Sequence, residues 1–255
     1  MRISIITATY NSEKTLLDTL LSLEKQTHPD IEYIVVDGAS KDNTIKLIKS
    51  NCTRVSKIIC EPDNGIYDAL NKGIQAASGD VIGFLHSDDL LAYDDVIADI
   101  AKAFERSGCD AVYGDLEYVA QNDTTKRIRL WKSGAFSRLK MKLGWMPPHP
   151  SFYMKRDCYG QFGCFSLDYR ISADYDSLLR YMLKQRISIT YLPKVLVKMR
   201  VGGISNRSVS SMVNKSMEDI RVMKHNGIIW PIALAYKNLS KLPQFIKKSN
   251  SHVKC

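Results

Sequence analysis

Two adjacent carboxylates follow a short apolar run about a third of the way along the chain. The run, Val81 to Leu85, is bounded by Gly79 and by acids, a pattern typical of a strand buried on both faces of a parallel sheet. Asp88 and Asp89 follow it, and neighbouring carboxylates repel unless solvent or a cation balances them. Hard divalent cations bind such oxygens and bridge them to phosphates. The pair therefore predicts either a metal site or a solvated acidic turn.

A second pair of acids, Asp174 and Asp176, precedes an apolar helical side that includes Leu178 and Leu179. Asp174 falls where the helix is expected to begin. A carboxylate there is stabilised by the unpaired N–H groups of the first turn, so capping is one interpretation for either acid. The other is general-base chemistry, which needs one carboxylate beside a reacting hydroxyl.

The elements that would position these acids alternate between strand and helix in the first ninety residues. Strands are expected at residues 3–8, 31–36, 55–60 and 81–85. Helical stripes such as Leu16, Leu20 and Leu23 separate them. This alternation predicts an α/β fold of βαβ units, with a Rossmann-like, mostly parallel sheet flanked by helices.

Ligands of such sheets bind beyond the carboxyl ends of the strands. Four polar segments are expected there: residues 7–11, 37–40, 61–65 and 87–89. Tyr10 could stack on a base, and Asp37 could accept a hydrogen bond from a base or a ribose. Each residue alone is ordinary turn chemistry, but together they favour a nucleotide site. The chain has no GxGxxG and no GxxxxGK[ST], which argues against a dinucleotide enzyme and a P-loop NTPase.

Two features of the second half carry open alternatives. His149 lies between two prolines, where it could contact an acceptor hydroxyl or a phosphate, or pack within a loop. Arg200 precedes Gly202 and Gly203. We expect a loop here that closes over a phosphate, with Arg200 stabilising a leaving group, or else a flexible exit loop.

The last segment, residues 206–255, is expected to be helical and basic. Apolar residues 228–236 are followed by Lys237 and further lysines at positions 241, 247, 248 and 254. Such a segment suits an anionic membrane surface, or it docks on the core with its lysines in solvent. The chain is thus expected to have three segments: residues 1–90, which bind nucleotide, residues 91–205, which bind acceptor, and this C-terminal segment.

Composition limits the class of protein. The 255 residues carry a formal net charge of +9, which suggests a polyanionic neighbour: nucleic acid, acidic lipid or a phosphorylated substrate. A non-catalytic nucleic-acid-binding module is an alternative, although no zinc-finger or stacked-aromatic RNA motif supports it. No apolar run reaches the ~18 residues of a membrane span. The six scattered cysteines and the absence of a signal-peptide pattern favour a cytoplasmic location.

Several motifs together resemble the family 2 glycosyltransferases of the GT-A fold. They are Thr9-Tyr10-Asn11, Val35 to Ser40, Asp63 to Gly65, Ala69 to Gly73, and Ser87 to Asp89. The resemblance extends over roughly the first 200 residues once the acids near position 174 are included. It implies a nucleotide-sugar donor, above all a UDP-sugar, a Mn²⁺ or Mg²⁺ ion at the acidic motif, and inversion at the anomeric carbon.

The resemblance also implies roles for single residues. Asp174 is the base and Asp89 binds the metal. From their own positions in the chain, His149, Asp176 and Arg200 are the candidates for contacting the acceptor or leaving group. The nucleotide-binding set is Thr9, Tyr10, Asp37, Gly65, Asn71 and Asp88, with Asp88 facing the donor sugar or ribose. The chain departs from the family at three positions: Gly38 replaces a second acid, Ser87 opens the metal motif, and Ala173 replaces a glutamate.

Bacterial enzymes that extend lipid-linked surface polysaccharides are the members it resembles. The implied acceptor is a sugar hydroxyl on a polyprenyl diphosphate, reached by a peripheral enzyme at the inner face of the cell membrane, with no nucleic-acid partner. A polyprenyl-phosphate acceptor, which needs no strong base, is the alternative within the same fold.

Overall fold

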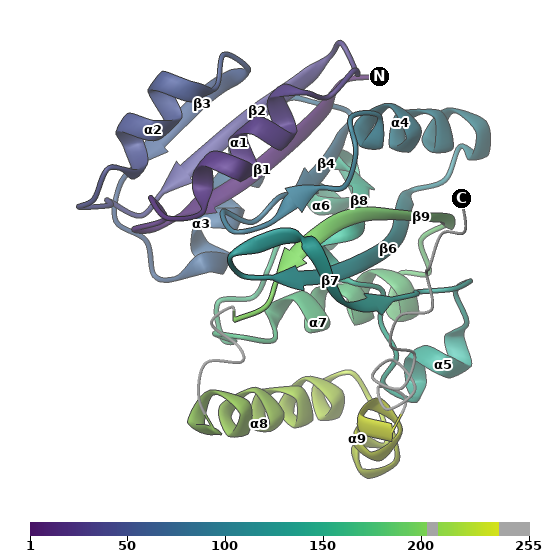
Figure 1. The fold of residues 1–255 in the computed structure, drawn as a ribbon. Coiled ribbons are helices and arrows are strands. Elements are labelled where there is room, and N and C mark those ends of the chain that lie inside the picture. The colour runs from purple at the N-terminus through teal and green to yellow at the C-terminus, as the bar shows by residue number, and fades with distance from the viewer. Residues whose placement is uncertain (203–208, 240–255) are drawn as a thin grey trace, which may run out of the picture.

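A single nine-stranded sheet forms the centre of the computed structural model (Figure 1). The structure describes residues 1–202 and 209–239. The strands pair in the order β3-β2-β1-β4-β8-β6-β9-β5, and β7 pairs with β6. Their bounds are β1 (Ile3–Thr9), β2 (Ile31–Asp37), β3 (Val55–Cys60), β4 (Val81–Phe84), β5 (Leu90–Leu91), β6 (Ala111–Ala120), β7 (Asp123–Trp131), β8 (Phe152–Lys155) and β9 (Ile189–Arg200).

The first half of the sheet is parallel. β1 lies between β2 and β4, and β3 extends the sheet beyond β2, all in parallel register. Every residue of β1 and β4 is buried, because helices cover both faces. A strand covered in this way reads as a continuous apolar run rather than an alternating one.

The second half of the sheet is mixed. β8 is antiparallel to both β4 and β6, whereas β6 and β9 are parallel. The sequence predicts two strands here, at residues 187–191 and 195–201, but β9 runs unbroken through Pro193. The exposed proline lies where the β6–β9 register shifts, and a bulge tolerates a residue without an N–H. The α/β class and the flanking helices are confirmed.

Helices cover the two faces as separate sets. Their bounds are α1 (Leu16–Glu24), α2 (Thr44–Asn51), α3 (Ile66–Ala76), α4 (Val96–Ser107), α5 (Arg138–Lys142), α6 (Arg156–Phe162), α7 (Ala173–Leu179), α8 (Val209–His225) and α9 (Trp230–Leu239), with a 3₁₀ turn η1 (His149–Ser151) and a π turn η2 (Arg180–Lys184). Buried residues of α1, α2 and α4 pack with Ile3 and Ile5 of β1. Those of α3, α6, α7, α8 and α9 pack with Ile6 and Ala8.

The C-terminal helices lie beneath α7 (Figure 1). Lys237 was expected among the surface lysines, but it is only 8% exposed, and its ammonium lies 2.7 Å from Asp219 Oδ2. That part of the membrane-facing interpretation is wrong, because a carboxylate on α8 draws this lysine inward. Lysines 241, 247, 248 and 254 lie outside the described residues. Among the helices that the structure describes, none is both long and apolar enough to cross a membrane.

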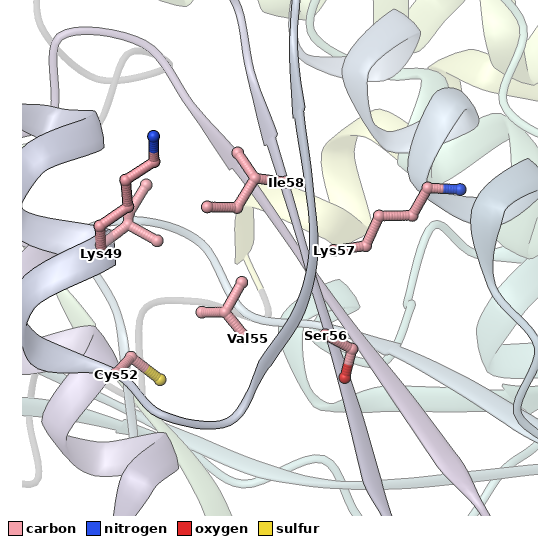
Figure 2. A pocket seen from close by; sticks show the side chains of 7 residues that line it. Lys49, Cys52, Val55, Ser56, Lys57 and Ile58 are labelled. Atoms are coloured by element: carbon pink, nitrogen blue, oxygen red, sulfur yellow. The ribbon is translucent and has the colours of Figure 1, made fainter.

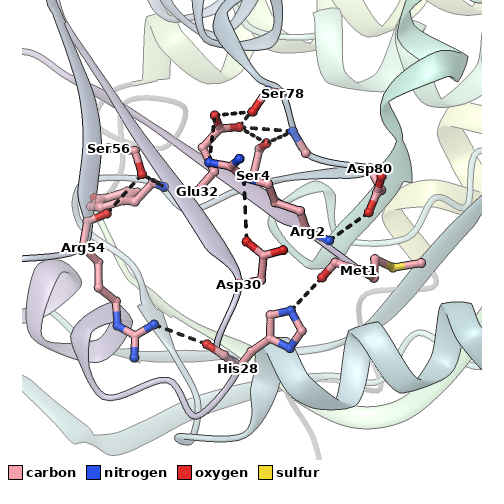
Figure 3. A network of polar contacts seen from close by, with 12 residues as sticks. Met1, Arg2, Ser4, His28, Asp30, Glu32, Arg54, Ser56, Ser78 and Asp80 are labelled. Carbon is pink, nitrogen blue, oxygen red and sulfur yellow. Dashed lines mark hydrogen bonds and ion pairs between the residues drawn. The ribbon is translucent and has the colours of Figure 1, made fainter.

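Polar contacts link the amino ends of the parallel strands to one another (Figure 3). Glu32 accepts hydrogen bonds from Ser4 and Ser78, and the N–H of Arg2 donates to Asp80. At the outer edge of the sheet a hollow of about 390 Å³ lies between α2, which supplies Lys49, and β3 (Figure 2). Its lining begins at the amino end of β3, so it lies away from the carboxyl ends where ligands bind.

Candidate active site

The ends of β1 and β2 are joined by hydrogen bonds around a buried carboxylate. Asp37, fully buried at the end of β2, accepts bonds from Thr9 Oγ1 at 2.9 Å and from the N–H and hydroxyl of Ser40 at 2.8 and 2.6 Å. Both Asp37 oxygens are thus engaged within the protein. Tyr10, in contrast, is 62% exposed and presents a free ring next to them.

An acid of the predicted 61–65 segment, to which the sequence assigned no role of its own, lies beside this ring. A methyl group placed on Gly38 would come within 2.4 Å of Asp63 Oδ2 and 3.4 Å of the Tyr10 ring. The carboxylate of Asp63, from the β3–α3 turn, therefore occupies the space that a side chain at position 38 would need. The chain replaces the missing second acid from another loop.

Two predicted nucleotide-binding residues have structural roles within the protein. Gly65 precedes α3 with φ of 113°, a conformation that favours glycine. The Asn71 amide donates to the carbonyl of Phe165 at 2.9 Å and accepts its N–H at 3.0 Å. These bonds tie α3 to the loop before α7. The nucleotide contacts predicted for Gly65 and Asn71 remain predictions.

The two acids after β4 have different surroundings. Asp89 is 1% exposed, and its Oδ1 accepts the N–H of Arg200 at 3.3 Å. Its Oδ2 is buried and has no hydrogen-bond partner among the described residues. Burial, reinforced by the charge of Asp88, raises the pKa of Asp89 well above its usual value. Asp88 is half-buried, and within the described part of the chain its carboxylate makes no hydrogen bond or ion pair.

This arrangement fits a divalent cation shared with a substrate. The described residues contain no cluster of three or more His, Cys, Asp or Glu side chains that could hold a metal. Mg²⁺ and Mn²⁺, however, are commonly held by one or two carboxylates together with substrate phosphates. The unpartnered Asp89 oxygen and the open Asp88 carboxylate supply that number, and the exposure of Asp88 makes it the more accessible ligand. The metal role predicted for Asp89 remains a prediction.

His86 and His149 lie between the acidic pair that follows β4 and the acids of α7. His149 is 6% exposed and stacks on Phe84 with ring centroids 5.2 Å apart. Its centroid is 6.3 Å from that of His86. Burial lowers the pKa of His149 to about 4 and also lowers that of His86. His86 was missed in the sequence, although its place immediately before the acidic motif is a usable signal.

Asp174 lies in the first turn of α7, as predicted. Its Oδ1 accepts the N–H of Tyr175 at 2.8 Å and lies 3.2 Å from the Tyr67 hydroxyl. Burial, followed by the charge of Asp174, raises the pKa of Tyr67 well above its usual value, so this hydroxyl keeps its proton. Tyr67 was also missed, because the sequence of α3 does not indicate a contact with a residue more than a hundred positions away.

Asp176 and Arg200 are held within the protein. Asp176 accepts a bond from Asn226 Nδ2 at 2.9 Å and lies 4.0 Å from Arg180. Arg200 ends β9 and is 5% exposed, so the expected phosphate loop does not include it. Its guanidinium bonds to Asp18 and to the carbonyls of Asp88 and Gln121. Arg200 thereby holds the backbone of the acidic motif in place from the buried side.

Solved structures with this fold are glycosyltransferases of GT-A type. TarS of S. aureus superposes with a TM-score of 0.67 at 21% identity, covering 89% of this chain and 39% of that longer chain. Its residues 1–349 with UDP-GlcNAc give 0.67 at 19%, covering 96% and 79%. The mannosyltransferase PcManGT from Pyrobaculum calidifontis, with GDP-Man and Mn²⁺, gives 0.63 at 17%, covering 97% and 76%. At these identities the likeness establishes the fold.

Sequence comparison then establishes the family. Residues 4–166 match the sequence model of Glycosyl transferase family 2. A PGL/p-HBAD biosynthesis glycosyltransferase of Mycobacterium bovis (strain BCG / Pasteur 1173P2) is 31% identical over 211 residues, 81% of this chain and 80% of the relative. The chain belongs to glycosyltransferase family 2 and is a glycosyltransferase, rather than a non-catalytic module.

Proposed function

We propose that this enzyme transfers a sugar from a UDP-sugar to a hydroxyl acceptor, with inversion at the anomeric carbon. One observation carries the proposal: the half-buried His86 ring, 6.3 Å from that of His149, lies close enough to both Asp88 and Asp174 for their charges to oppose the lowering of its pKa by burial. A carboxylate suited to the donor's metal and one suited to a base therefore flank the same ring. Uridine is favoured because TarS has been solved with UDP and UDP-GlcNAc. The GDP-Man complex of PcManGT makes guanosine the competing nucleoside.

The donor side is built from Tyr10, Asp63 and Asp37. The exposed Tyr10 ring stacks on the base, and a base or ribose donor binds Asp63, which lies beside that ring. Asp37 acts mainly by fixing the ends of β1 and β2 through Thr9 and Ser40. This division assigns recognition to the open carboxylate and scaffolding to the saturated one.

Asp88, with Asp89 behind it, would hold Mn²⁺ or Mg²⁺ against the diphosphate. When bound, the ion offsets the negative charge that develops on the leaving group. The chain contributes the two carboxylates and the Arg200 contacts that keep their loop in place. His149, which is buried, and His86, which is half-buried, are both neutral at neutral pH and help to exclude water from the region between donor and base.

Asp174 accepts the proton of the acceptor hydroxyl during in-line attack. Its Oδ1 is held by the Tyr175 N–H and lies beside the Tyr67 hydroxyl. Its Oδ2 has no such contact among the described residues and is left for the acceptor. A carboxylate fixed on one oxygen and open on the other suits a general base.

The acceptor in this proposal is a saccharide on a polyprenyl diphosphate at the inner membrane surface. Support comes from a face formed by α5 and α9, since Gly144, two residues after α5, lies against Ala233 of α9. Ile229, just before α9, and Ile232, on α9, are 69% and 55% exposed. The exposed α5 residues are Arg138, Leu139, Lys140 and Lys142. Apolar side chains beside cations suit an anionic lipid surface.

Calorimetric titration with UDP, GDP and dTDP, each with Mn²⁺ and with EDTA, tests the donor side. We expect UDP to bind only with Mn²⁺, and Asp88→Asn to abolish this binding. If none of the three nucleotides binds under either condition, the proposal is wrong. Preference for GDP would keep the reaction and replace the donor.

Vesicle co-sedimentation tests the membrane side. Full-length protein should bind vesicles of phosphatidylglycerol better than those of phosphatidylcholine, and Ile229→Gln with Ile232→Gln should weaken this binding. Ile128→Gln, a change at a 50%-exposed residue of β7, is the matched control. Equal binding by all variants would remove the α5–α9 face from the proposal.

A further inference from the structure

The segment before Asp174 is held by a carboxylate from α8. Glu218 Oε1 accepts the N–H of Arg170 at 3.1 Å, and Oε2 accepts those of Ile171 and Ser172 at 2.8 and 2.9 Å. Backbone N–H groups at the start of a helix have no partner within that helix. Bonds from such groups to an ionised carboxylate are among the stronger ones in proteins. Glu218 therefore fixes three successive peptide units just ahead of Asp174.

Ser172 is tied to the same helix through its side chain. It occupies the N-cap position of α7, where a serine usually accepts a bond from its own helix, yet it makes no such bond. Its hydroxyl instead donates to Asp219 Oδ1 at 2.9 Å. The Ser172 hydroxyl, which would ordinarily cap α7, thus contacts α8.

Asp219 is itself held by α9. It is 4% exposed, and Lys237 donates to its Oδ2 at 2.7 Å. Burial disfavours the Asp219 carboxylate, but the charges of Lys237 and Lys215 and the hydrogen bonds from Lys237 and Ser172 outweigh it and lower the pKa of Asp219. The Lys237 ammonium also lies 4.1 Å from the ring centroid of Tyr175, the residue next to Asp174.

The opposite side of the segment is contacted by α3. The Tyr67 hydroxyl lies 2.7 Å from the carbonyl oxygen of Ile171 and 3.2 Å from Asp174 Oδ1. Residues 170–175 are therefore hydrogen-bonded to α3 and to α8, and the Tyr175 ring is contacted by Lys237 of α9. The α8 and α9 contacts come from residues beyond the 4–166 region that matches the family.

We infer that Glu218 and Asp219 are positioning residues for the base, and that the α8–α9 pair is a part of the catalytic apparatus. The inference rests on the proposed role of Asp174. A base displaced by about 1 Å costs on the order of 100-fold in rate. Loss of the three Glu218 bonds would permit such a shift while leaving the nucleotide side, at the ends of β1, β2 and β4, unchanged.

Glu218→Gln is the direct test, because it keeps the shape but turns one acceptor oxygen into an amide donor. The readouts are UDP release from UDP-GlcNAc with Mn²⁺ and water as the nucleophile, and the Kd for UDP by calorimetry. We expect UDP release to fall about 10- to 100-fold with Kd changed less than about twofold. Hydrogen exchange of the amides in residues 170–175 should accelerate, whatever the hydrolysis rate.

Two further variants separate positioning from general damage. Glu105→Gln, on the exposed side of α4, should change none of the readouts. Ser172→Ala, which removes one bond and no charge, should give a smaller loss of UDP release in the same direction. Wild-type exchange rates and UDP release in Glu218→Gln, or a parallel loss of UDP affinity and thermal stability, would overturn the inference.

A double variant makes the test specific for the base. In an Asp174→Asn background, Glu218→Gln should cause no further loss of UDP release, because a positioning residue acts only through the group it positions. The same fold loss in both backgrounds would contradict the inference. Failure of the proposed function gives a different result: Asp174→Asn alone would then release UDP at the wild-type rate.

Discussion

Two buried carboxylates, one at the amino ends of the parallel strands and one at their carboxyl ends, have contrasting surroundings. We call these two ends the amino edge and the carboxyl edge of the sheet. At the amino edge, Glu32 is 7% exposed and accepts bonds from the Ser4 hydroxyl, from the N–H and hydroxyl of Ser78, both at 2.7 Å, and from the N–H of Gly79 at 3.2 Å (Figure 3). Burial disfavours its charge, but these bonds outweigh burial and lower the pKa of Glu32.

At the carboxyl edge, Asp89 is even more buried but has one backbone bond and one oxygen without a partner. Its pKa moves the other way, because burial and Asp88 both oppose its charge. A native group left unsatisfied calls for an explanation, and the cation proposed above would provide it. The carboxylate at the amino edge is satisfied by the fold itself, whereas the proposal assigns the one at the carboxyl edge to a ligand.

The largest effect we expect is on turnover. Asp174→Asn should reduce transfer to a hydroxyl acceptor about 10²- to 10⁴-fold, with the Kd for UDP unchanged. Asp176→Asn, whose carboxylate faces Asn226, is the matched comparison and should lose less than about tenfold. Steady-state kinetics with calorimetry decides. Little loss in Asp174→Asn would indicate the polyprenyl-phosphate acceptor, which needs no strong base.

The next effect is on stability at acid pH. The pKa of His149 is lowered to about 4 from 6.5, chiefly by burial. As the pH falls below 6.5, His149 takes up a proton in the unfolded chain, but in the folded protein it does so only near pH 4. Protonation therefore favours the unfolded state, and the free energy of unfolding falls progressively across this window, by up to about 3 kcal/mol. Urea unfolding at pH 7 and pH 4.5 should show a smaller difference in His149→Gln. His225→Gln, at an exposed position, should behave as wild type.

A moderate loss of stability is expected at the amino edge. Glu32→Gln exchanges an acceptor for a donor facing the N–H groups of Ser78 and Gly79, which should cost about 2 kcal/mol. Thermal unfolding should shift downward by about 4–8 °C, while UDP affinity stays unchanged. Glu105→Gln serves as the control. Loss of UDP binding by folded Glu32→Gln would break the contrast between the two edges.

The smallest effect has the opposite sign. Asp89→Asn removes a buried, partly unpaired charge, so the metal-free protein in EDTA should gain about 1 kcal/mol, or about 2–4 °C in Tm. The same variant should weaken Mn²⁺-dependent UDP binding. A lower Tm in EDTA would mean that the Asp89 charge serves the fold, as that of Glu32 does.

The sequence predicts the parallel half of the sheet closely. Strands buried on both faces leave apolar runs that end at turns, so the observed bounds of β1 to β4 differ from the expected ones by at most one residue. Pro193 misled the prediction for β9, because a proline in a bulge looks like a break. β5 has two residues, too few to form a pattern.

Site residues were predictable where chemistry is visible in a loop, and not where it depends on distant contacts. Asp88, Asp89 and Asp174 stand out by type and position. Glu218 and Lys237 do not, since acids and lysines on a helix ordinarily face solvent. Only the tertiary structure shows that they reach residues 171–175.

The reach of Glu218 across 46 residues to Ser172 also has a consequence for biosynthesis. Chains are made from the N-terminus, and their early segments begin to fold before the later ones exist. The strands that form the nucleotide side are complete by residue 91, long before α8 emerges from the ribosome. A nascent chain would thus be able to recognise its donor before its proposed base is fixed, and would not consume nucleotide-sugar until α8 has been made.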